Sequence, residues 1–396
     1  MNVGIIGGGI VGLTLARELV SADDPCRVTV LEKEAVLGAH QTSHNSGVVH
    51  AGLYYTPGSL KARLCARGRI LMNEYCQANG VTYTESGKLV VAVDDSEVGR
   101  LHEIHRRAQA NGVPDLRWLE RDAIGTVEPH VRGVAAVHSP RTAVVDFAAV
   151  AAAVAHDVRR AGGEVLTSSP VTAIRRRGGR IQVLAAGREH VFDRLVVCAG
   201  LQSDRVSRLA GGSADPRIVP FVGMYYRLVA ARAELVRSLV YPVPDPRYPF
   251  LGVHLTRTVR EEVLVGPNAV LGLAREGYRP GRVNLRDVAT TLGWPGFYRL
   301  AARHWRAGVI ELNHTVRRHA FMSAARRYVP ELRDQDVERA GAGVRAQAVS
   351  VRGALLDDFA VDDVDGVLSV RNAPSPAATS SFAIAEYLAP RVLGRN

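Results

Sequence analysis

The stretch VGIIGGGIVGLTLARELV, residues 3–20, decides the fold of this chain. Residues 3–6 contain no polar side chain and predict a short strand, and residues 13–20 predict a helix. Between them, Gly7, Gly9 and Gly12 have the spacing G-x-G-x-x-G. In this context the first glycine allows a tight turn, the second lets the backbone approach a pyrophosphate, and the third lets helix and strand pack closely. The stretch therefore predicts a dinucleotide-binding βαβ unit.

A second strand supports this prediction. Residues 27–31 are mostly apolar and are followed by Glu32, twenty residues after Gly12. A carboxylate at this place can accept hydrogen bonds from a ribose diol, and it disfavours a 2′-phosphate. An ordinary strand–turn–helix does not explain Glu32, and we expect Lys33 beside it to be a further cofactor contact.

Length and composition limit the class of protein. The 396 residues predict two to three domains, and a content of 47% hydrophobic and 22% charged residues excludes a disordered or collagen-like chain. The net charge of +11 comes from 50 basic residues, of which only Lys33, Lys61 and Lys88 are lysine. Such a charge suits nucleic acid, a membrane surface or an acidic substrate. Because no recognised nucleic-acid-binding motif is present, we expect no nucleic-acid partner.

The cysteines and the first residues bear on location. Four cysteines in so long a chain do not form a disulfide framework, and none has the spacing of a zinc-ligand pair, so we expect no metal site. The sequence begins directly with the first strand, and glycines, Arg17 and Glu18 interrupt its first apolar run. These features predict a cytoplasmic protein, with a peripheral membrane contact left open.

Three further segments favour FAD over a nicotinamide dinucleotide. The loop at residues 40–53 is polar and rich in small residues, which suits a long phosphate–ribitol chain and a flat ring. The strand predicted at 193–197 ends in small residues, after a predicted hairpin at 171–184, and the small-residue segment 372–381 precedes a predicted helix at 382–393. From these segments we expect cofactor contacts at Thr42, Ser43, Asn45, Ser46, Gly47, Val171, Ala199, Gly200, Pro376, Ala377, Thr379 and Ser380.

Several long stretches carry a family resemblance. They are HQTSHNSGVVHAGLYYTPGSLKA from residue 40, YPVPDPRYPFLGVHLTR from 241, VGPNAVLGLAREGY from 265, AGVRAQAV from 342 and NAPSPAATSS from 372. The chain resembles the FAD-dependent L-2-hydroxyglutarate oxidase/dehydrogenase family, within the D-amino-acid oxidase/glycerol-3-phosphate dehydrogenase superfamily. The resemblance implies an α/β fold, in which a Rossmann-type FAD-binding domain is interleaved with an α+β substrate domain built on a mostly antiparallel sheet. We expect the FAD-binding domain at 1–85, 145–215 and 335–396, and the substrate-binding domain at 86–144 and 216–334.

The resemblance also implies a reaction. It is the oxidation of an L-2-hydroxy acid, with L-2-hydroxyglutarate to 2-oxoglutarate as the first choice, by hydride transfer from Cα to flavin N5. The hydroxyl proton needs a base, and an imidazole suits that task. His50 is the first candidate, because residues 50–53 resemble a His-Gly-Gly-Leu segment beside the flavin in glycerophosphate-oxidising relatives; a flavin hydrogen bond or a covalent flavin link are alternatives. His254, on a strand predicted at 251–257, is the second, with a satisfied histidine on a sheet face as its alternative.

A carboxylate-bearing substrate needs cationic partners. Arg345 lies in a small-residue segment that is similar to the one that delivers a substrate-binding arginine in relatives, and a guanidinium can hold a carboxylate with two hydrogen bonds. Lys61 follows the flavin loop and could hold a second carboxylate or balance charge on the reduced flavin, with an exposed helix lysine as the alternative. Tyr55, in the same segment, is predicted to contact substrate.

One segment departs from the family pattern. The family usually has an arginine and an acidic residue where this chain has Val222 and Met224. Joint loss is expected for an ion pair, because removal of one partner alone would leave a charge unpaired. If that pair shapes the substrate pocket, the alternative function is an FAD-dependent oxidase of another alcohol, an amine or an amino acid. Either oxygen or a membrane quinone could accept the electrons.

Overall fold

The computed structural model describes residues 1–22, 24–279 and 281–395. The predicted βαβ unit is present as β1 (Asn2–Ile6), α1 (Ile10–Val20) and β2 (Arg27–Leu31). The helix begins earlier than predicted because Gly12 lies inside its first turns rather than before them. These elements belong to a six-stranded sheet of order β20-β21-β13-β1-β2-β9. Its other strands are β9 (Glu164–Leu166), β13 (Arg194–Val197), β20 (Ala360–Val364) and β21 (Val367–Asn372).

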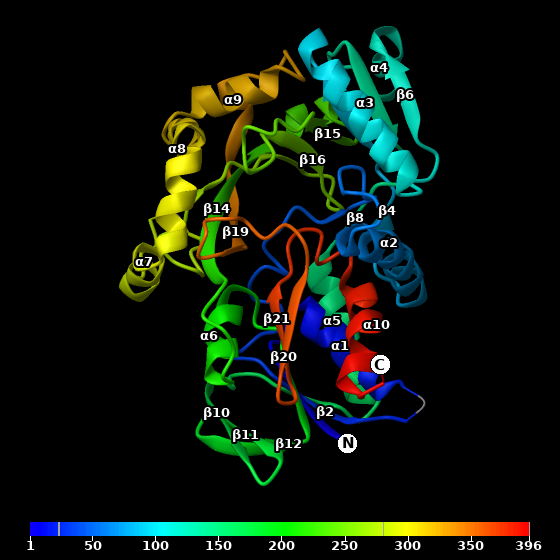
Figure 1. Ribbon diagram of the computed structural model, residues 1–396. Helices are drawn as coiled ribbons and strands as arrows, with labels where there is room; N and C mark the ends of the chain where they lie inside the picture. Colours follow the sequence, from blue (N-terminus) through cyan, green and yellow to red (C-terminus); the bar gives the residue numbers. More distant parts are fainter. Residues whose placement is uncertain (23, 280, 396) are drawn as a thin grey trace.

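Both faces of this sheet are covered. One face packs against α1, α5 (Phe147–Arg160) and α10 (Ser381–Val392), which lie side by side, and α2 (Leu60–Ala78) packs against α10 (Figure 1). The other face packs against a small antiparallel sheet of β10 (Val171–Arg177), β11 (Arg180–Ala185) and β12 (Arg188–Phe192). Strands that are buried on both faces need apolar residues at successive positions, which explains the uninterrupted apolar runs in β1 and β13.

A nine-stranded sheet forms the second layer. Its order is β18-β14-β17-β16-β15-β5-β7-β6, and β19 pairs along β14. Neighbouring strands are antiparallel, except that β5 and β15 run parallel. The predicted fold class is confirmed. The strands are β5 (Lys88–Ala92), β6 (Arg117–Glu120), β7 (Ala135–Ser139), β14 (Arg217–Leu228), β15 (Leu239–Pro242), β16 (His254–Arg257), β17 (Val263–Gly266), β18 (Val270–Leu271) and β19 (Val337–Val349).

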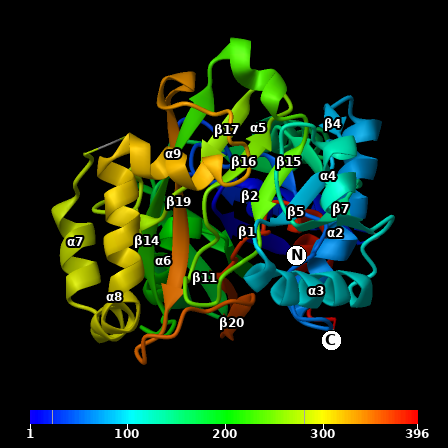
Figure 2. The same cartoon turned by 90° about the horizontal axis from the view of Figure 1, so that it is seen from above.

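The remaining elements surround these two sheets. A small sheet joins β3 (Val48–Val49), β8 (Ala143–Val145) and β4 (Tyr83–Thr84). Helices α7 and α8 lie on the outer side of β14 and β19, at the left margin of the views in Figures 1 and 2, and α9 lies at the top of Figure 1. The other helices are α3 (Asp95–Ala110), α4 (Arg121–Val127), α6 (Ser203–Leu209), α7 (Leu285–Leu292), α8 (Pro295–Val316) and α9 (Arg318–Arg326).

Two details differ from the expectations. The FAD-binding domain was expected to resume at 335, but β19 pairs along β14 in the nine-stranded sheet, where its backbone hydrogen bonds are satisfied. The strand predicted at 251–257 begins only at His254, because residues 251–253 have no strand partner. The division into two domains stays a prediction, and its ranges also include residues 23, 280 and 396, which lie outside the described residues.

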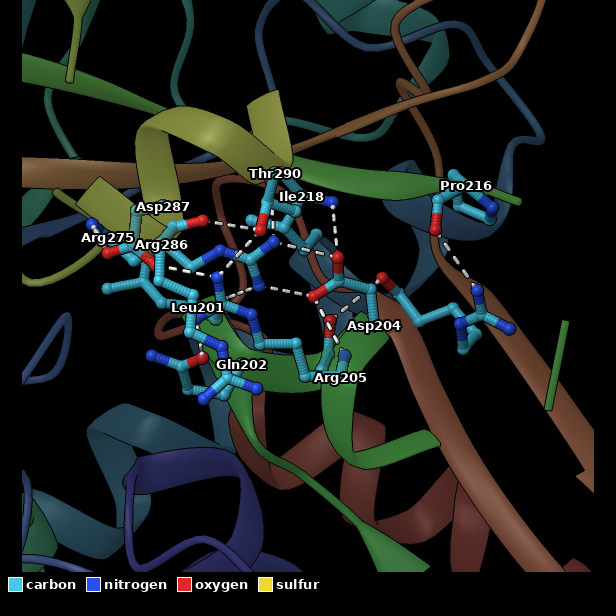
Figure 3. A network of polar contacts seen from close by, with 12 residues as sticks. Leu201, Gln202, Asp204, Arg205, Pro216, Ile218, Arg275, Arg286, Asp287 and Thr290 are labelled. Atoms are coloured by element: carbon cyan, nitrogen blue, oxygen red, sulfur yellow. Dashed lines mark hydrogen bonds and ion pairs between the residues drawn. The ribbon is translucent and has the colours of Figure 1, made fainter. Parts of the chain in front are cut away.

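A buried ion pair fastens the start of α6 to the segment between β18 and α7. The guanidinium of Arg275, 1% exposed, contacts both carboxylate oxygens of Asp204 and donates to the carbonyl oxygens of Leu201 (2.9 Å) and Ile218 (3.1 Å) (Figure 3). Asp204 also accepts from the Ile218 N–H. Both carboxylate oxygens of Asp204 and both Nη atoms of Arg275 thus have partners, as a buried charge requires.

We expect Arg275→Met to lower the free energy of unfolding by about 3–5 kcal/mol, because it leaves the Asp204 carboxylate buried and unpaired. The double variant Arg275→Met/Asp204→Leu removes the stranded charge and should recover part of this loss. Urea unfolding followed by circular dichroism measures both, with Arg175→Met on the exposed end of β10 as a matched control. A loss no larger than that of the control would contradict the role of the pair.

Candidate active site

The glycine-rich turn has the geometry that the sequence predicts. Gly7 has φ +116°, and a Cβ on it would overlap the carbonyl oxygen of Cys198. A Cβ on Gly12 would overlap the carbonyl oxygen of Gly7, so both glycines are required for close packing. At Gly9 the nearest atom to such a Cβ is Thr42 Oγ1 at 3.3 Å, which leaves the backbone accessible. Thr42 Oγ1 accepts a hydrogen bond from the first amide of α1, that of Ile10, at 3.1 Å.

Glu32 is held in place at the end of β2. Its carboxylate accepts hydrogen bonds from the backbone N–H of Gly8 (2.7 Å) and of Glu34 (2.8 Å). Lys33 points away, toward Glu34 and Glu276, and its Nζ lies 3.0 Å from Glu276. Glu34, His40 and Glu276 have the spacing of a metal-ligand group, but the Lys33 ammonium is bound to the same carboxylates.

A cavity of about 700 Å³ opens beside this turn. Nine of the predicted cofactor contacts line it: Gly7, Gly9, Glu32, Lys33, Thr42, Val171, Ala199, Gly200 and Ala377. The lining also includes four charged residues that the sequence did not suggest, Arg205, Glu276, Arg286 and Arg371. The other predicted contacts are not among the lining residues: Gly12, Ser43, Asn45, Ser46, Gly47, Pro376, Thr379 and Ser380.

Some of these others have structural partners. Ser43 is exposed and donates to the Gly38 carbonyl, while Asn45 stabilises its own turn by accepting from the Gly47 N–H at 2.8 Å. Pro376 is at the end of a cis peptide bond in the segment before α10. Thr379 accepts from the backbone N–H of His50 at 3.1 Å, so it joins that segment to the 40–53 loop.

The residues present fit FAD. One end of the cavity offers a glycine turn, the N-terminus of α1 and a carboxylate, which match a pyrophosphate and a ribose. Asn372 also lines the cavity, and its Oδ1 is buried without a hydrogen-bond partner among the described residues. Buried polar atoms normally have partners, so this oxygen is available to a polar ligand.

A buried lysine that the sequence analysis missed lies near the predicted histidines. Lys88 begins β5 and is 1% exposed. Its Nζ lies 3.6 Å from the ring centroid of Tyr241 and 4.6 Å from that of Tyr54. Burial lowers the pKa of Lys88 to about 7. The parallel pairing of β5 with β15 places Lys88 beside Tyr241, although 153 positions separate the two in sequence (241 − 88).

The two predicted histidines are brought together by the fold. His254 stacks on Tyr241 with ring centroids 4.0 Å apart, and its Nδ1 lies 2.9 Å from the Gly252 carbonyl oxygen. Because a carbonyl only accepts, Nδ1 carries the proton and Nε2 keeps its lone pair. Burial, with the charges of Lys88 and Arg345, lowers the pKa of His254 to about 3. Burial holds the pKa of His50 well below its usual range, and the charges of Lys88 and, to a smaller extent, His254 act in the same direction.

Arg345 faces the same group. It lies on β19 opposite Phe221, and its guanidinium carbon is 4.9 Å from the ring centroid of Phe250. Burial lowers its pKa, while Tyr225, Glu311 and Tyr241 act in the opposite direction. An arginine stays charged under such conditions, so this side of the site keeps a positive charge.

Lys61 and Tyr55 lie at the edge of this group. The Lys61 ammonium binds the Asp357 carboxylate at 2.8 Å and lies 5.0 Å from the Tyr55 ring centroid. Burial raises the pKa of Tyr55 well above its usual range, so its hydroxyl stays protonated. Asp357 neutralises the charge of Lys61. The cations that lower the pKa of His254 are Lys88 and Arg345.

Val222 and Met224 lie on the other face of the sheet. Val222 pairs with Val344, and its neighbour Phe221 pairs with Arg345. Since side chains alternate along a strand and paired residues share a face, Val222 points away from Arg345. The same alternation puts Met224 with Val222. The departure from the family pattern is therefore not next to the buried cations.

Residues 2–391 match the model of the family described as FAD dependent oxidoreductase. The chain belongs to this family. FAD is the family's cofactor, which confirms the choice made from the sequence. No helix among residues 1–22, 24–279 and 281–395 has the length and apolar content needed to cross a bilayer.

Curated relatives cover nearly the whole chain. L-2-hydroxyglutarate dehydrogenase, mitochondrial, of Caenorhabditis elegans is 44% identical over 99% of this chain and 93% of the relative. L-2-hydroxyglutarate dehydrogenase of Escherichia coli K12 is 39% identical over 98% of this chain and 92% of the relative. These relatives confirm the resemblance, and they place this FAD-dependent oxidoreductase among enzymes that act on a CH–OH donor.

Solved structures agree on the fold. L-α-glycerophosphate oxidase from Mycoplasma pneumoniae, with FAD bound, superimposes with a TM-score of 0.81 at 22% identity, covering 99% of this chain and 94% of the other. Glycine oxidase from Geobacillus kaustophilus gives a TM-score of 0.73 at 19% identity, covering 100% and 95%. At these identities the likeness shows the fold alone.

Proposed function

We propose that the protein oxidises L-2-hydroxyglutarate to 2-oxoglutarate with FAD. The observation that carries this proposal is a pair of buried cations beside one histidine. Lys88 lies over the Tyr241 ring, on which His254 stacks, and both Lys88 and Arg345 lower the pKa of His254. Two cations suit a substrate with two carboxylates, because each buried carboxylate needs a charged partner. The names of the curated relatives support the same substrate.

Each residue has a proposed role. Arg345 holds one carboxylate with its planar fork, and Lys88 holds the other as a point charge. His254 Nε2 takes the hydroxyl proton, because the Gly252 carbonyl fixes Nδ1–H. Both carboxylates oppose the cations that lower the pKa of His254, so substrate binding makes it a better base. His50 is assigned a place beside the cofactor, where it helps to position the flavin.

The cofactor supplies the hydride acceptor when it is bound. The glycine turn would hold its pyrophosphate, Glu32 its ribose, and the small residues before α10 its polar ring edge. We also assign to the cofactor the predicted contacts that do not line the cavity. Thr379, in the segment before α10, accepts a hydrogen bond from the His50 N–H, so this segment and the 40–53 loop lie together. Tyr55 and Lys61 are proposed to close the substrate side.

Anaerobic reduction of the purified yellow protein tests the substrate. We expect L-2-hydroxyglutarate to bleach the flavin absorbance rapidly. The matched compounds are D-2-hydroxyglutarate, L-lactate, which lacks the second carboxylate, and L-glutamate, which has an amine in place of the hydroxyl. Faster bleaching by L-glutamate would favour an amino-acid oxidase, and equal rates with L-lactate would contradict a role for both cations.

The electron acceptor is a separate proposal. A lipid-soluble quinone as acceptor would require a peripheral membrane contact, whereas oxygen would not. Reoxidation of the substrate-reduced protein by air and by a quinone analogue, compared in one experiment, distinguishes them. A cytoplasmic location stays a prediction from the cysteine content, to be tested by cell fractionation.

A further inference from the structure

Helix α8 exposes an apolar stripe. Trp305, Val309, Leu312 and Val316 follow one another at steps of three and four residues, so they lie on one face of the helix. Their side chains are 58–74% exposed. The buried Ala307 lies on the opposite face and holds the helix to the body of the protein. Contiguous exposed apolar surface of this kind marks an interaction site more often than chance exposure does.

The stripe continues onto α7. Leu285, at the start of that helix, is 81% exposed, and Leu292 at its end is 46% exposed. Figure 2 shows α7 and α8 next to each other at the margin of the molecule, and the two helices are in contact. We call these residues, with Tyr298 and the neighbouring arginines, the α7–α8 face.

The charges beside the stripe have one sign. Arg299 and Arg303 lie before the bend of α8 at His304, Arg306 lies after it, and Arg317 follows the end of the helix. We call these four residues the arginine row. Glu311 is the one acidic residue in α8, and its carboxylate is turned inward to accept from the Ala269 N–H at 2.8 Å. The exposed side of the helix is therefore apolar and positively charged.

We propose that the α7–α8 face docks the protein on an anionic lipid bilayer. A helix with an apolar stripe beside basic residues lies in the bilayer interface, where tryptophan and tyrosine favour the headgroup level. Basic residues add attraction to anionic lipids. The inference rests on the peripheral membrane contact considered under the proposed function. It adds which surface of the protein makes that contact and that the lipid is anionic.

A second copy of the chain is the other occupant to consider. The repeat of apolar residues at steps of three and four also suits helix pairing. The arginine row, however, would need an acidic row on the partner helix. The positions that flank the other side of the stripe are Ala301, Gly308 and Thr315, which supply no negative charge. Charge complementarity therefore favours the bilayer.

A groove opens on this face. It has a volume of about 370 Å³, and Trp305, Leu312 and Phe250 are among its lining residues. The guanidinium of Arg345 lies over the Phe250 ring, so one wall of the groove contacts a residue of the candidate active site. Docking through this face would bring an apolar acceptor dissolved in the bilayer to the outer end of the groove.

Vesicle flotation of the FAD-loaded protein tests the proposal. We expect binding to vesicles of equal parts phosphatidylcholine and phosphatidylglycerol, and little binding to phosphatidylcholine alone. Trp305→Ser/Leu312→Ser should weaken binding about tenfold or more, because it removes buried apolar area. Arg303→Gln/Arg306→Gln should weaken it about 25-fold, at about fivefold for each arginine.

A matched control and two further readouts complete the experiment. Arg175→Gln/Arg177→Gln removes the same charge from the exposed β10 hairpin and should leave binding unchanged. Equal losses in both arginine pairs, or no binding to anionic vesicles, would overturn the proposal. So would a dimer, measured without vesicles by analytical ultracentrifugation, that Trp305→Ser/Leu312→Ser dissociates. Turnover with a water-soluble dye should be unchanged in this variant, which separates a failure of docking from a failure of the proposed reaction.

Discussion

Lys88→Met is expected to lower kcat/KM for L-2-hydroxyglutarate by about 100-fold at pH 6, because it leaves a substrate carboxylate buried without its charged partner. The effect should shrink as pH rises. The pKa of Lys88 is lowered to about 7, so the wild-type ammonium is present below that pH and is lost above it. Wild-type kcat/KM should therefore fall about tenfold per pH unit above pH 7, as one proton is lost from the free enzyme. Bound substrate raises this pKa, so kcat should fall only at higher pH.

Two variants serve as controls for this prediction. Lys88→Arg stays charged and should abolish the alkaline fall in kcat/KM, even if its larger head lowers the absolute rate. Lys61→Met should have the smaller effect, because Asp357 already neutralises Lys61. A Lys88→Met loss that is the same at pH 6 and pH 9 would assign Lys88 a packing role between Tyr54 and Tyr241 instead.

His254→Asn should lower the rate constant of anaerobic flavin reduction by about 10²- to 10⁴-fold, the range for loss of a general base. Asparagine can still donate to the Gly252 carbonyl, so the local backbone should be retained while the Nε2 lone pair is lost. Stopped-flow absorbance gives this rate constant and the substrate Kd separately. We expect the Kd to change little, since in the proposed function Arg345 and Lys88 supply the binding charges.

His50→Asn distinguishes between the two imidazoles. It should reduce the rate less than His254→Asn does, and it should shift the flavin absorbance spectrum if His50 lies beside the cofactor as proposed. Should His50→Asn instead remove the larger share of the rate with an unchanged spectrum, His50 would be the base.

The cofactor end of the site could be predicted well because its signal is local. A tight turn, a close backbone approach and a carboxylate after the second strand each leave a mark at a fixed spacing in one segment. The turn at Gly7 and the hydrogen bond from the Gly8 N–H to Glu32 lie within the first 32 residues, and the cavity opens beside them. The family itself followed from longer stretches, and the comparisons confirm it.

The substrate end was predicted less completely, because it forms only when distant strands pair. Lys88 can be recognised as a site residue only from its contact with Tyr241. The parallel pairing of β5 and β15 brings these two residues together. One signal was present: Lys88 is one of three lysines, and it begins an entirely apolar strand. The sequence also could not show whether Val222 lies next to the substrate-binding residues. Only its pairing with Val344 shows which face of the sheet it occupies.

The path of the chain has a practical consequence. The strands that carry Lys88, His254 and Arg345 come from three separate stretches, and β19 runs directly from the nine-stranded sheet into the segment that leads to β21. No single cut in the polypeptide separates a complete cofactor module from a complete substrate module. Swapping one contiguous segment between relatives to exchange their substrate specificity would therefore separate paired strands of a sheet. Transplanting individual side chains onto the intact scaffold is the route that this topology allows.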